Sequence, residues 1–335
     1  MRIGNKKERL EVGLHISDKI RVAKVCFPGG ADKKDNKWRI ADLDKADLPE
    51  TLEEGGAIAD PARLGEILTS LVKKMKLETV SVTASLPGPQ VYFRTMILPA
   101  MSQRYLKKSV LFEAERFLPI PVAEAAVSVC LSKDLEENGE KRIEVFLVAA
   151  RKQHVMNLKN SCQQAKLNLR TVEIEPLALQ RIMKMPEKDS TYGCLFLNPG
   201  HCTICVFEGA LLQYYRYFHL MAKETIWAVQ NSGEASAGDN EETAIFYSGQ
   251  IILEIKRALE YCYQQHKRDF DSVTICGSLQ GFDSLQRALM NEFDFGVEIF
   301  VLETPDIFMD ETEKKEKINT GEYLAALGLA VREVS

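Results

Sequence analysis

Short apolar runs and one amphipathic helix organise the first part of the chain. The runs are rich in Val, Ile and Trp and are separated by polar turns, as expected of short strands; they cover residues 12–18, 20–27 and 37–43. Residues 61–76 repeat apolar positions at helical spacing, and Pro61 suits the first turn of a helix. The pattern therefore predicts three strands, a helix, and a further strand over residues 78–86.

A second unit begins after the Leu-Pro-Gly-Pro break at residues 86–89, where two prolines and a glycine interrupt the pattern. The expected elements are a strand at 91–99, a helix at 102–117, strands at 124–133 and 142–150, a helix at 152–166 and a strand at 167–175. This β-α-β-β-α-β order is typical of a small α+β module, and it lies inside the chain rather than at an end.

The rest of the chain again places strands before helices. Strand patterns cover 192–200, 202–218, 271–279 and 297–303, and helical patterns cover 242–267, 280–293 and 321–333. The strand-turn-strand that starts at residue 12 has a loose echo in the one that starts at residue 193. Duplicated halves of this kind occur in the actin-type nucleotide fold.

Composition narrows the class of protein. With 335 residues, 45% hydrophobic and 27% charged, the chain suits a globular protein of one large or two medium domains. A net charge of −5 without a strongly basic block argues against nucleic acid as the main partner. Because no stretch approaches 18 apolar residues and the N-terminus has no signal-peptide core, we expect a cytoplasmic protein that does not enter a membrane.

One pair of cysteines, Cys202-x-x-Cys205 beside His201, raises the question of a metal or redox motif. A structural zinc site needs about four converging Cys or His ligands, and the chain has no second pair of this kind. The alternation of C-T-I-C-V-F predicts a strand whose two cysteines point to opposite faces, whereas a redox pair normally opens a helix. We interpret these cysteines as buried free thiols and expect no metal; zinc or redox chemistry is the alternative.

One set of sequence motifs is specific enough to indicate a resemblance to a known protein family. They are the turn Leu86-Pro87-Gly88, the strand end Leu98-Pro99, and Glu113-Ala114-Glu115-Arg116-Phe117-Leu118-Pro119-Ile120-Pro121. The helix at 252–262, the segment ICGSLQGFDSLQRAL and the tail YLAALGLAVR extend the match. With these motifs the chain resembles the type IV pilus assembly protein PilM family from about residue 10 to residue 333.

The resemblance implies an α/β, actin-like fold of the FtsA and PilM type, with two lobes and an inserted β-α-β-β-α-β subdomain. The expected first lobe comprises residues 9–87, 171–192 and 322–335. The inserted subdomain would cover 88–170, and the second lobe 193–321.

The resemblance also implies a binding partner and a cellular location. PilM-like proteins bind the N-terminal cytoplasmic peptide of the inner-membrane protein PilN and so form a cytoplasmic scaffold, at the inner-membrane face, of the pilus machine. Other proteins of the pilus machinery are implied as partners. Whether the protein forms a homo-oligomer or a ring is left open. The implied peptide groove lies between the inserted subdomain and the first lobe, near the strand 91–99 and the helix 102–117. Our groove hypothesis names Val91, Phe93, Leu98, Pro99 and Phe112.

Members of the family hold ATP between the lobes, but the matching positions here are altered. The Asp positions of the two phosphate hairpins are His15 and Asn198, and Ser17 replaces a turn glycine. The altered cleft would comprise His15, Ser17, Asp18, Lys19, Asn198, Gly200, His201, Thr203, Gly277 and Ser278. Magnesium is a hard cation that prefers carboxylates, so we expect no hydrolysis and assign no catalytic residue.

Two interpretations of the cleft follow. The first is a scaffold that needs no cofactor. The alternative is a nucleotide-binding actin-like ATPase, with ATP and magnesium as cofactors, that controls pilus or type II secretion-like assembly. Whether Lys19 or Arg21 compensates for the lost carboxylates is open at this point.

Overall fold

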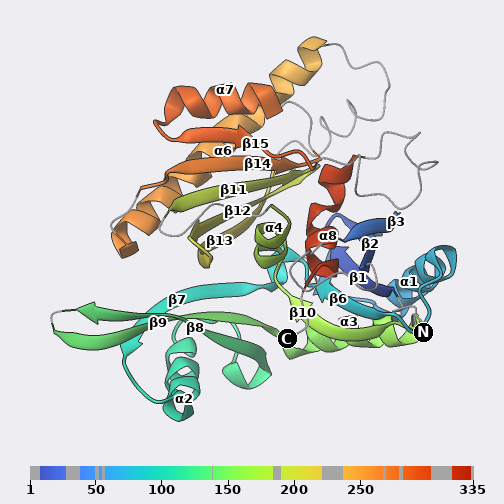
Figure 1. Ribbon diagram of the computed structural model, residues 1–335, viewed down its shortest axis with the longest axis horizontal. Coiled ribbons are helices and arrows are strands. Elements are labelled where there is room, and N and C mark those ends of the chain that lie inside the picture. The colour runs from blue at the N-terminus through green and yellow to red at the C-terminus, as the bar shows by residue number, and fades with distance from the viewer. Residues whose placement is uncertain are drawn as a thin grey trace, which may run out of the picture.

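The computed structural model describes residues 8–27, 38–49, 53–54, 57–137, 139–183, 190–220, 237–266, 269–278, 282–302 and 319–332. Two five-stranded sheets and a separate three-stranded sheet make up the framework (Figure 1). In this part of the chain no helix is long and apolar enough to cross a membrane.

The first five-stranded sheet has the order β10-β6-β1-β2-β3. Its strands are β1 (Arg9–Ile16), β2 (Lys19–Phe27), β3 (Arg39–Asp47), β6 (Ser81–Ser85) and β10 (Asn168–Glu173). β1 pairs antiparallel with β2 and parallel with β6. The helices α1 (Pro61–Met75) and α3 (Lys152–Gln164) cover one face, and β4 (Glu53–Glu54) and β5 (Ala57–Ile58) form a small hairpin. Asp60 caps α1, because its side chain accepts the N–H groups of Ala62 and Arg63.

The second five-stranded sheet has the order β13-β12-β11-β14-β15, and its first three strands repeat the hairpin arrangement of the first. The strands are β11 (Thr191–Asn198), β12 (His201–Glu208), β13 (Leu211–His219), β14 (Ser272–Gly277) and β15 (Gly296–Ile299). The predicted run 202–218 is thus divided into two strands by a turn at Gly209, whose φ is +56°. The helices α6 (Ala237–His266) and α7 (Phe282–Glu292) cover the outer face.

Two short helices lie between the five-stranded sheets: α4 (Glu175–Met183) and α8 (Leu324–Ala330), the latter preceded by the 3-10 turn η5 (Thr320–Tyr323) (Figure 1). One continuous hydrophobic cluster contains residues of β2, α4, β11 and α8. Every residue of α8 is buried. The two lobes therefore share a core instead of meeting only at a hinge.

The inserted sheet has the order β7-β9-β8 and consists of β7 (Tyr92–Pro99), β8 (Ala125–Glu137) and β9 (Glu140–Arg151). The helix α2 (Gln103–Ala114) packs on one of its faces, and the 3-10 turns η2 (Gly88–Gln90) and η3 (Val122–Glu124) introduce β7 and β8. The six-element pattern predicted for this module does not form one sheet. Its last strand, β10, pairs in parallel with β6, and α3 packs on α1, because the chain has by then returned to the first lobe.

The cysteine pair follows the strand prediction. Cys202 and Cys205 are both fully buried on β12, and they belong to different hydrophobic clusters on the two faces of the second sheet. Burial raises the pKa of both thiols well above the usual value, so both are protonated at neutral pH. The prediction that they point to opposite faces is confirmed.

Candidate functional site

The first hairpin of the cleft is formed by β1 and β2, and its turn carries Ser17 and Asp18. Arg21 lies on β2 opposite His15 and is only 1% exposed. Its guanidinium donates to both carboxylate oxygens of Asp18, at 2.9 and 3.1 Å, and to Ser17 Oγ at 2.9 Å. The buried guanidinium of Arg21 therefore stabilises the turn.

The second hairpin is formed by β11 and β12, with the turn at Pro199 and Gly200. Gly200 has φ +83°, a conformation that glycine adopts without strain, and so the turn glycine keeps its role. Asn198 Oδ1 accepts the Ser278 hydroxyl at 2.8 Å, and Ser278 N–H donates to the Leu197 carbonyl at 2.9 Å. Asn198 thus serves to fasten the end of β14 to the hairpin.

The turns of the two hairpins lie against each other. His201 Nδ1 lies 3.8 Å from Asp18 Oδ1, and its ring stacks on Tyr217 with centroids 5.2 Å apart. Burial lowers the pKa of His201 to about 4, so the ring is neutral at neutral pH. Burial alone would raise the pKa of Asp18, but Arg21, with a smaller contribution from His201, holds it below 3.8.

A second buried pair joins the first hairpin to α4. His15 Nε2 lies 2.6 Å from Glu175 Oε2, and both side chains are nearly inaccessible to solvent. Burial would raise the pKa of Glu175, but the hydrogen bond from His15 lowers it overall. The His15 ring also meets Phe196 of the second sheet edge to face, with centroids 6.1 Å apart. The residue at the expected Asp position is therefore an internal partner of a carboxylate.

Further ion pairs surround the first hairpin. Glu322 of η5 contacts Arg21 at 3.3 Å and Lys45 at 2.7 Å. Lys19 turns outward and pairs with Asp47 at 2.8 Å. The same η5 turn lies directly on β14, since a Cβ added to Gly321 would stand 1.9 Å from the Gly277 carbonyl oxygen.

The structure brings together most of the cleft residues named from the sequence. Asp18 contacts both Ser17 and His201, and Asn198 contacts Ser278. Thr203 is buried on β12, and Gly277 (φ +119°) lies beneath η5. Sequence reasoning missed Glu175 and Glu322 and left the role of Arg21 open. Their signal was faint, since each is one charged residue beside an apolar run.

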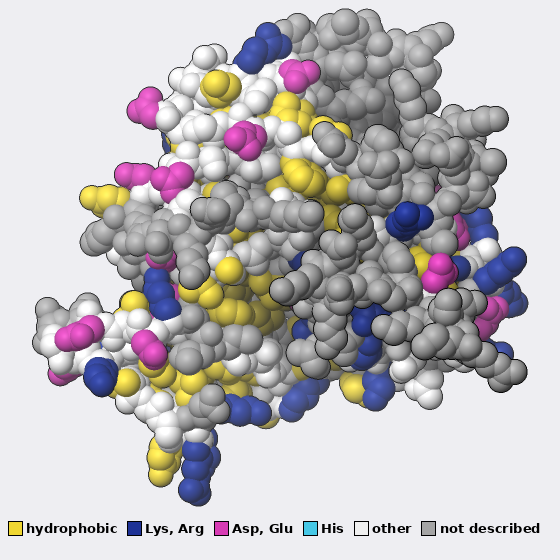
Figure 2. All heavy atoms as spheres, in the orientation of Figure 1, with side chains coloured by type: hydrophobic (Ala, Val, Ile, Leu, Met, Phe, Trp, Pro, Cys, Tyr) yellow, Lys and Arg dark blue, Asp and Glu magenta, His cyan; other side chains and the backbone are white. Residues whose placement is uncertain are grey.

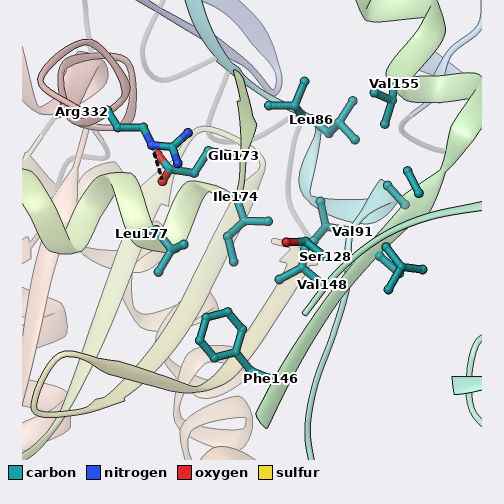
Figure 3. Close-up of a pocket in the computed structure, with 15 residues that line it drawn as sticks. Leu86, Val91, Ser128, Phe146, Val148, Val155, Glu173, Ile174, Leu177 and Arg332 are labelled. Carbon is teal, nitrogen blue, oxygen red and sulfur yellow. Dashed lines mark ion pairs between the residues drawn. The ribbon is translucent and has the colours of Figure 1, made fainter. Parts of the chain in front are cut away.

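A separate apolar cavity of about 350 Å³ lies between the inserted sheet and the first lobe. Figure 3 shows Phe146 and Val148 on one side and Ile174 and Leu177 on the other. The cavity is bordered by β8, the edge strand of the inserted sheet, which contributes Ala126, Val127 and Ser128. Its charged end carries the Glu173–Arg332 pair, 3.5 Å apart (Figure 3).

A second cavity, of about 410 Å³, lies between the first residues of β7 and the second half of β13. It is lined by Gly88, Pro89, Val91, Tyr92, Phe93, Arg94, Phe117, Tyr215, Arg216 and Tyr217.

The five residues of the groove hypothesis do not line one cavity. Val91 borders both cavities, and Phe93 borders the second. Leu98 and Pro99 lie at the far end of β7, where Leu98 packs against the core beneath α2. Phe112 stands on the outer face of α2, 68% exposed.

Comparison with known proteins defines the class and then the family. A solved PilM–PilN type IV pilus biogenesis complex is 20% identical over 96% of this chain and 98% of that chain, with a TM-score of 0.76. The ethanolamine utilization protein EutJ from Carboxydothermus hydrogenoformans is 13% identical over 96% of this chain and 89% of that chain, with a TM-score of 0.50. The protein has the actin-like ATPase fold.

The family follows from the sequence itself. The pattern that describes the type IV pilus assembly protein PilM matches residues 18–192, more than half of the 335 residues. The chain belongs to the PilM family, and both the expected fold and the resemblance are confirmed.

Proposed function

We propose that this protein is a cytoplasmic scaffold of a type IV pilus assembly machine, held at the inner-membrane face by the N-terminal peptide of a PilN-like protein. Membership of the PilM family supports the pilus role. A relative of the same fold was solved as a PilM–PilN complex, which supports a PilN-like partner. Other pilus proteins would then assemble around it.

The observation that carries the proposal is the apolar cavity between the inserted sheet and the first lobe. It is bordered by the edge strand β8, whose outer backbone groups are available for an added strand, because β8 pairs only with β9 among the described strands. An extended peptide can add to such an edge and place alternate side chains in a pocket. The apolar walls favour aliphatic or aromatic side chains, and Glu173 and Arg332 provide a polar end.

We also propose that the scaffold works without ATP hydrolysis. Two of the carboxylates near the first hairpin, Asp18 and Glu175, already have buried partners of their own. Arg21, the buried cation beside the hairpin turn, is bound by Asp18 and Glu322. Bound ATP and magnesium would have to break both buried pairs, so the residues present do not fit that cofactor.

The test is a groove-filling substitution. Ala126→Trp places a large ring in the cavity and should weaken binding of the PilN-like N-terminal peptide at least tenfold, measured by calorimetric titration, because side chains of the peptide lose their pocket. Ala123→Trp is the matched control, since Ala123 is exposed just before β8 and does not line the cavity. Unchanged affinity of a folded Ala126→Trp variant would contradict the proposed groove.

A further inference from the structure

The outer face of α2 combines aromatic rings with basic side chains. The helix buries Leu106, Val110 and Ala114 against the inserted sheet. On the opposite face Tyr105 is 58% and Phe112 68% exposed. Tyr105, Lys108 and Phe112 are spaced by three and four residues, so they form one stripe along the helix.

The charge of this face is positive although the whole chain carries −5. Arg104, Lys107 and Lys108 are exposed, and within the described residues no carboxylate pairs with any of them. Arg116 is neutralised by Glu113 at 3.4 Å, and Glu115 is an exposed acid at the C-terminal end. Arg104 and Lys108 therefore accompany the two rings, and Lys107 lies on the flank of the helix beside its buried face.

The shape of this face favours a lipid surface over a folded protein as its binding partner. Hydrophobic side chains and Lys or Arg side chains project together at the lower end of the molecule, over α2 (Figure 2). A stable protein interface needs about 1,000 Å² of well-fitted surface, which a protruding tip does not offer. A lipid interface accepts protruding aromatic rings among its headgroups and attracts nearby Lys and Arg when it is anionic.

We propose that the outer face of α2 binds an anionic phospholipid surface. Arg104 and Lys108 would lie among the headgroups, and Tyr105 and Phe112 would enter the interface without crossing the membrane. The proposed peptide groove lies on the other face of the same three-stranded sheet. This cooperation rests on the proposed function: once a peptide tether holds the protein near the membrane, the local concentration of α2 at the lipid surface rises, and the lipid contact strengthens the tether in the same way.

The test is co-sedimentation of the purified full chain with vesicles of equal parts phosphatidylglycerol and phosphatidylcholine. Binding is expected at low salt, and it should be lost at high salt and on pure phosphatidylcholine vesicles. Lys108→Ala should weaken binding about fivefold and Arg104→Ala/Lys108→Ala about 25-fold, since each basic side chain near such a surface contributes about 1 kcal/mol. Phe112→Ala should also weaken binding at low salt, because the exposed ring no longer enters the interface.

Lys159→Ala is the matched control, because Lys159 is an exposed lysine on α3, away from this face. The inference is wrong if the wild-type chain does not bind the anionic vesicles at low salt, or if the α2 variants bind as tightly as Lys159→Ala. Titration of the same variants with the PilN-like peptide separates the two proposals. If Lys108→Ala weakens peptide binding while no vesicle binding exists, α2 contacts the protein partner instead of lipid.

Discussion

At the scale of single residues, the charged side chains beside the two hairpins pair with one another. His15 occupies the position where the family pattern has Asp, and it contacts Glu175, a residue 160 positions further along the chain. Asp18 and Arg21 form a second pair, and His201 lies against that pair as a neutral ring. Removing one member of a buried pair leaves a charge without compensation, so these residues depend on one another.

The neutral state of His201 predicts a dependence of stability on pH. Its pKa is about 4 in the folded protein and about 6.5 when the ring is free in the unfolded chain. The contribution of His201 is therefore complete above pH 6.5 and is lost as the pH falls toward 4, because only the unfolded chain takes up the proton. The free energy of unfolding should fall by about 3 kcal/mol over this range.

Chemical denaturation at a series of pH values measures this decline. His201→Gln should flatten it, whereas His154→Gln should leave most of it, because His154 is more accessible to solvent. Below about pH 4.5 a further loss is expected from Asp18 and Glu175, whose lowered pKa values make the unfolded chain the better proton acceptor. An equally steep decline in the His201→Gln variant would disprove the assignment.

At the scale of elements, α4 and α8 approach closely because small residues line their contact. A Cβ added to Gly328 would stand 2.0 Å from the Ala178 carbonyl oxygen, and one added to Gly13 would stand 1.9 Å from the Ala326 carbonyl oxygen. The absence of side chains at these glycines lets α8 lie directly on α4 and β1. The position of η5, and with it Glu322, depends on this packing.

Gly328→Ala should therefore separate α8 from α4 and lower the free energy of unfolding by about 1–3 kcal/mol, as overpacking of a core does. Thermal and chemical denaturation measure the change. Gly249→Ala, on α6, is the control: nothing lies within 4 Å of its added Cβ, and alanine favours a helix. If the Gly328→Ala variant is as stable as Gly249→Ala, α8 can shift away from α4 without loss of stability, and the prediction is wrong.

At the scale of the whole molecule, the two lobes are joined at three levels. The hydrophobic cluster around α4 and α8 contains residues of both five-stranded sheets. The contact of Asp18 with His201 and the ring contact of His15 with Phe196 join the two five-stranded sheets. The inserted sheet is fastened to the second lobe as well, since Lys133 of β8 contacts Glu208 of β12 at 2.9 Å.

A molecule joined in this way should not need nucleotide to hold its lobes together. We expect calorimetric titration with millimolar ATP to give no heat beyond dilution, with or without magnesium, because the buried pairs occupy the groups that phosphate would use. Titration of the same preparation with the PilN-like peptide is the control for folded protein. Tight, magnesium-dependent binding of ATP would support the alternative of a nucleotide-controlled actin-like protein.

The sequence by itself determined most of the elements, though not α4 or the division of 202–218 into two strands, and it indicated the actin-like fold and the family. Apolar periodicity is local, so it identifies the strand of Cys202 and Cys205 and the helix at 61–76 without any knowledge of their neighbours. The motif positions also exposed the replacements His15 and Asn198. Only the tertiary structure decided that His15 meets Glu175, that Arg21 is buried on Asp18, and that β10 joins the first sheet.

The same limit applies to the groove, whose walls come from β8, β9, β10 and α4. Local pattern shows which face of an element is buried, but it does not show which distant side chain lies opposite. That choice depends on strand register, on the close approach of α8 at its glycines and on the closure of two lobes around one core, which are properties of the whole folded chain.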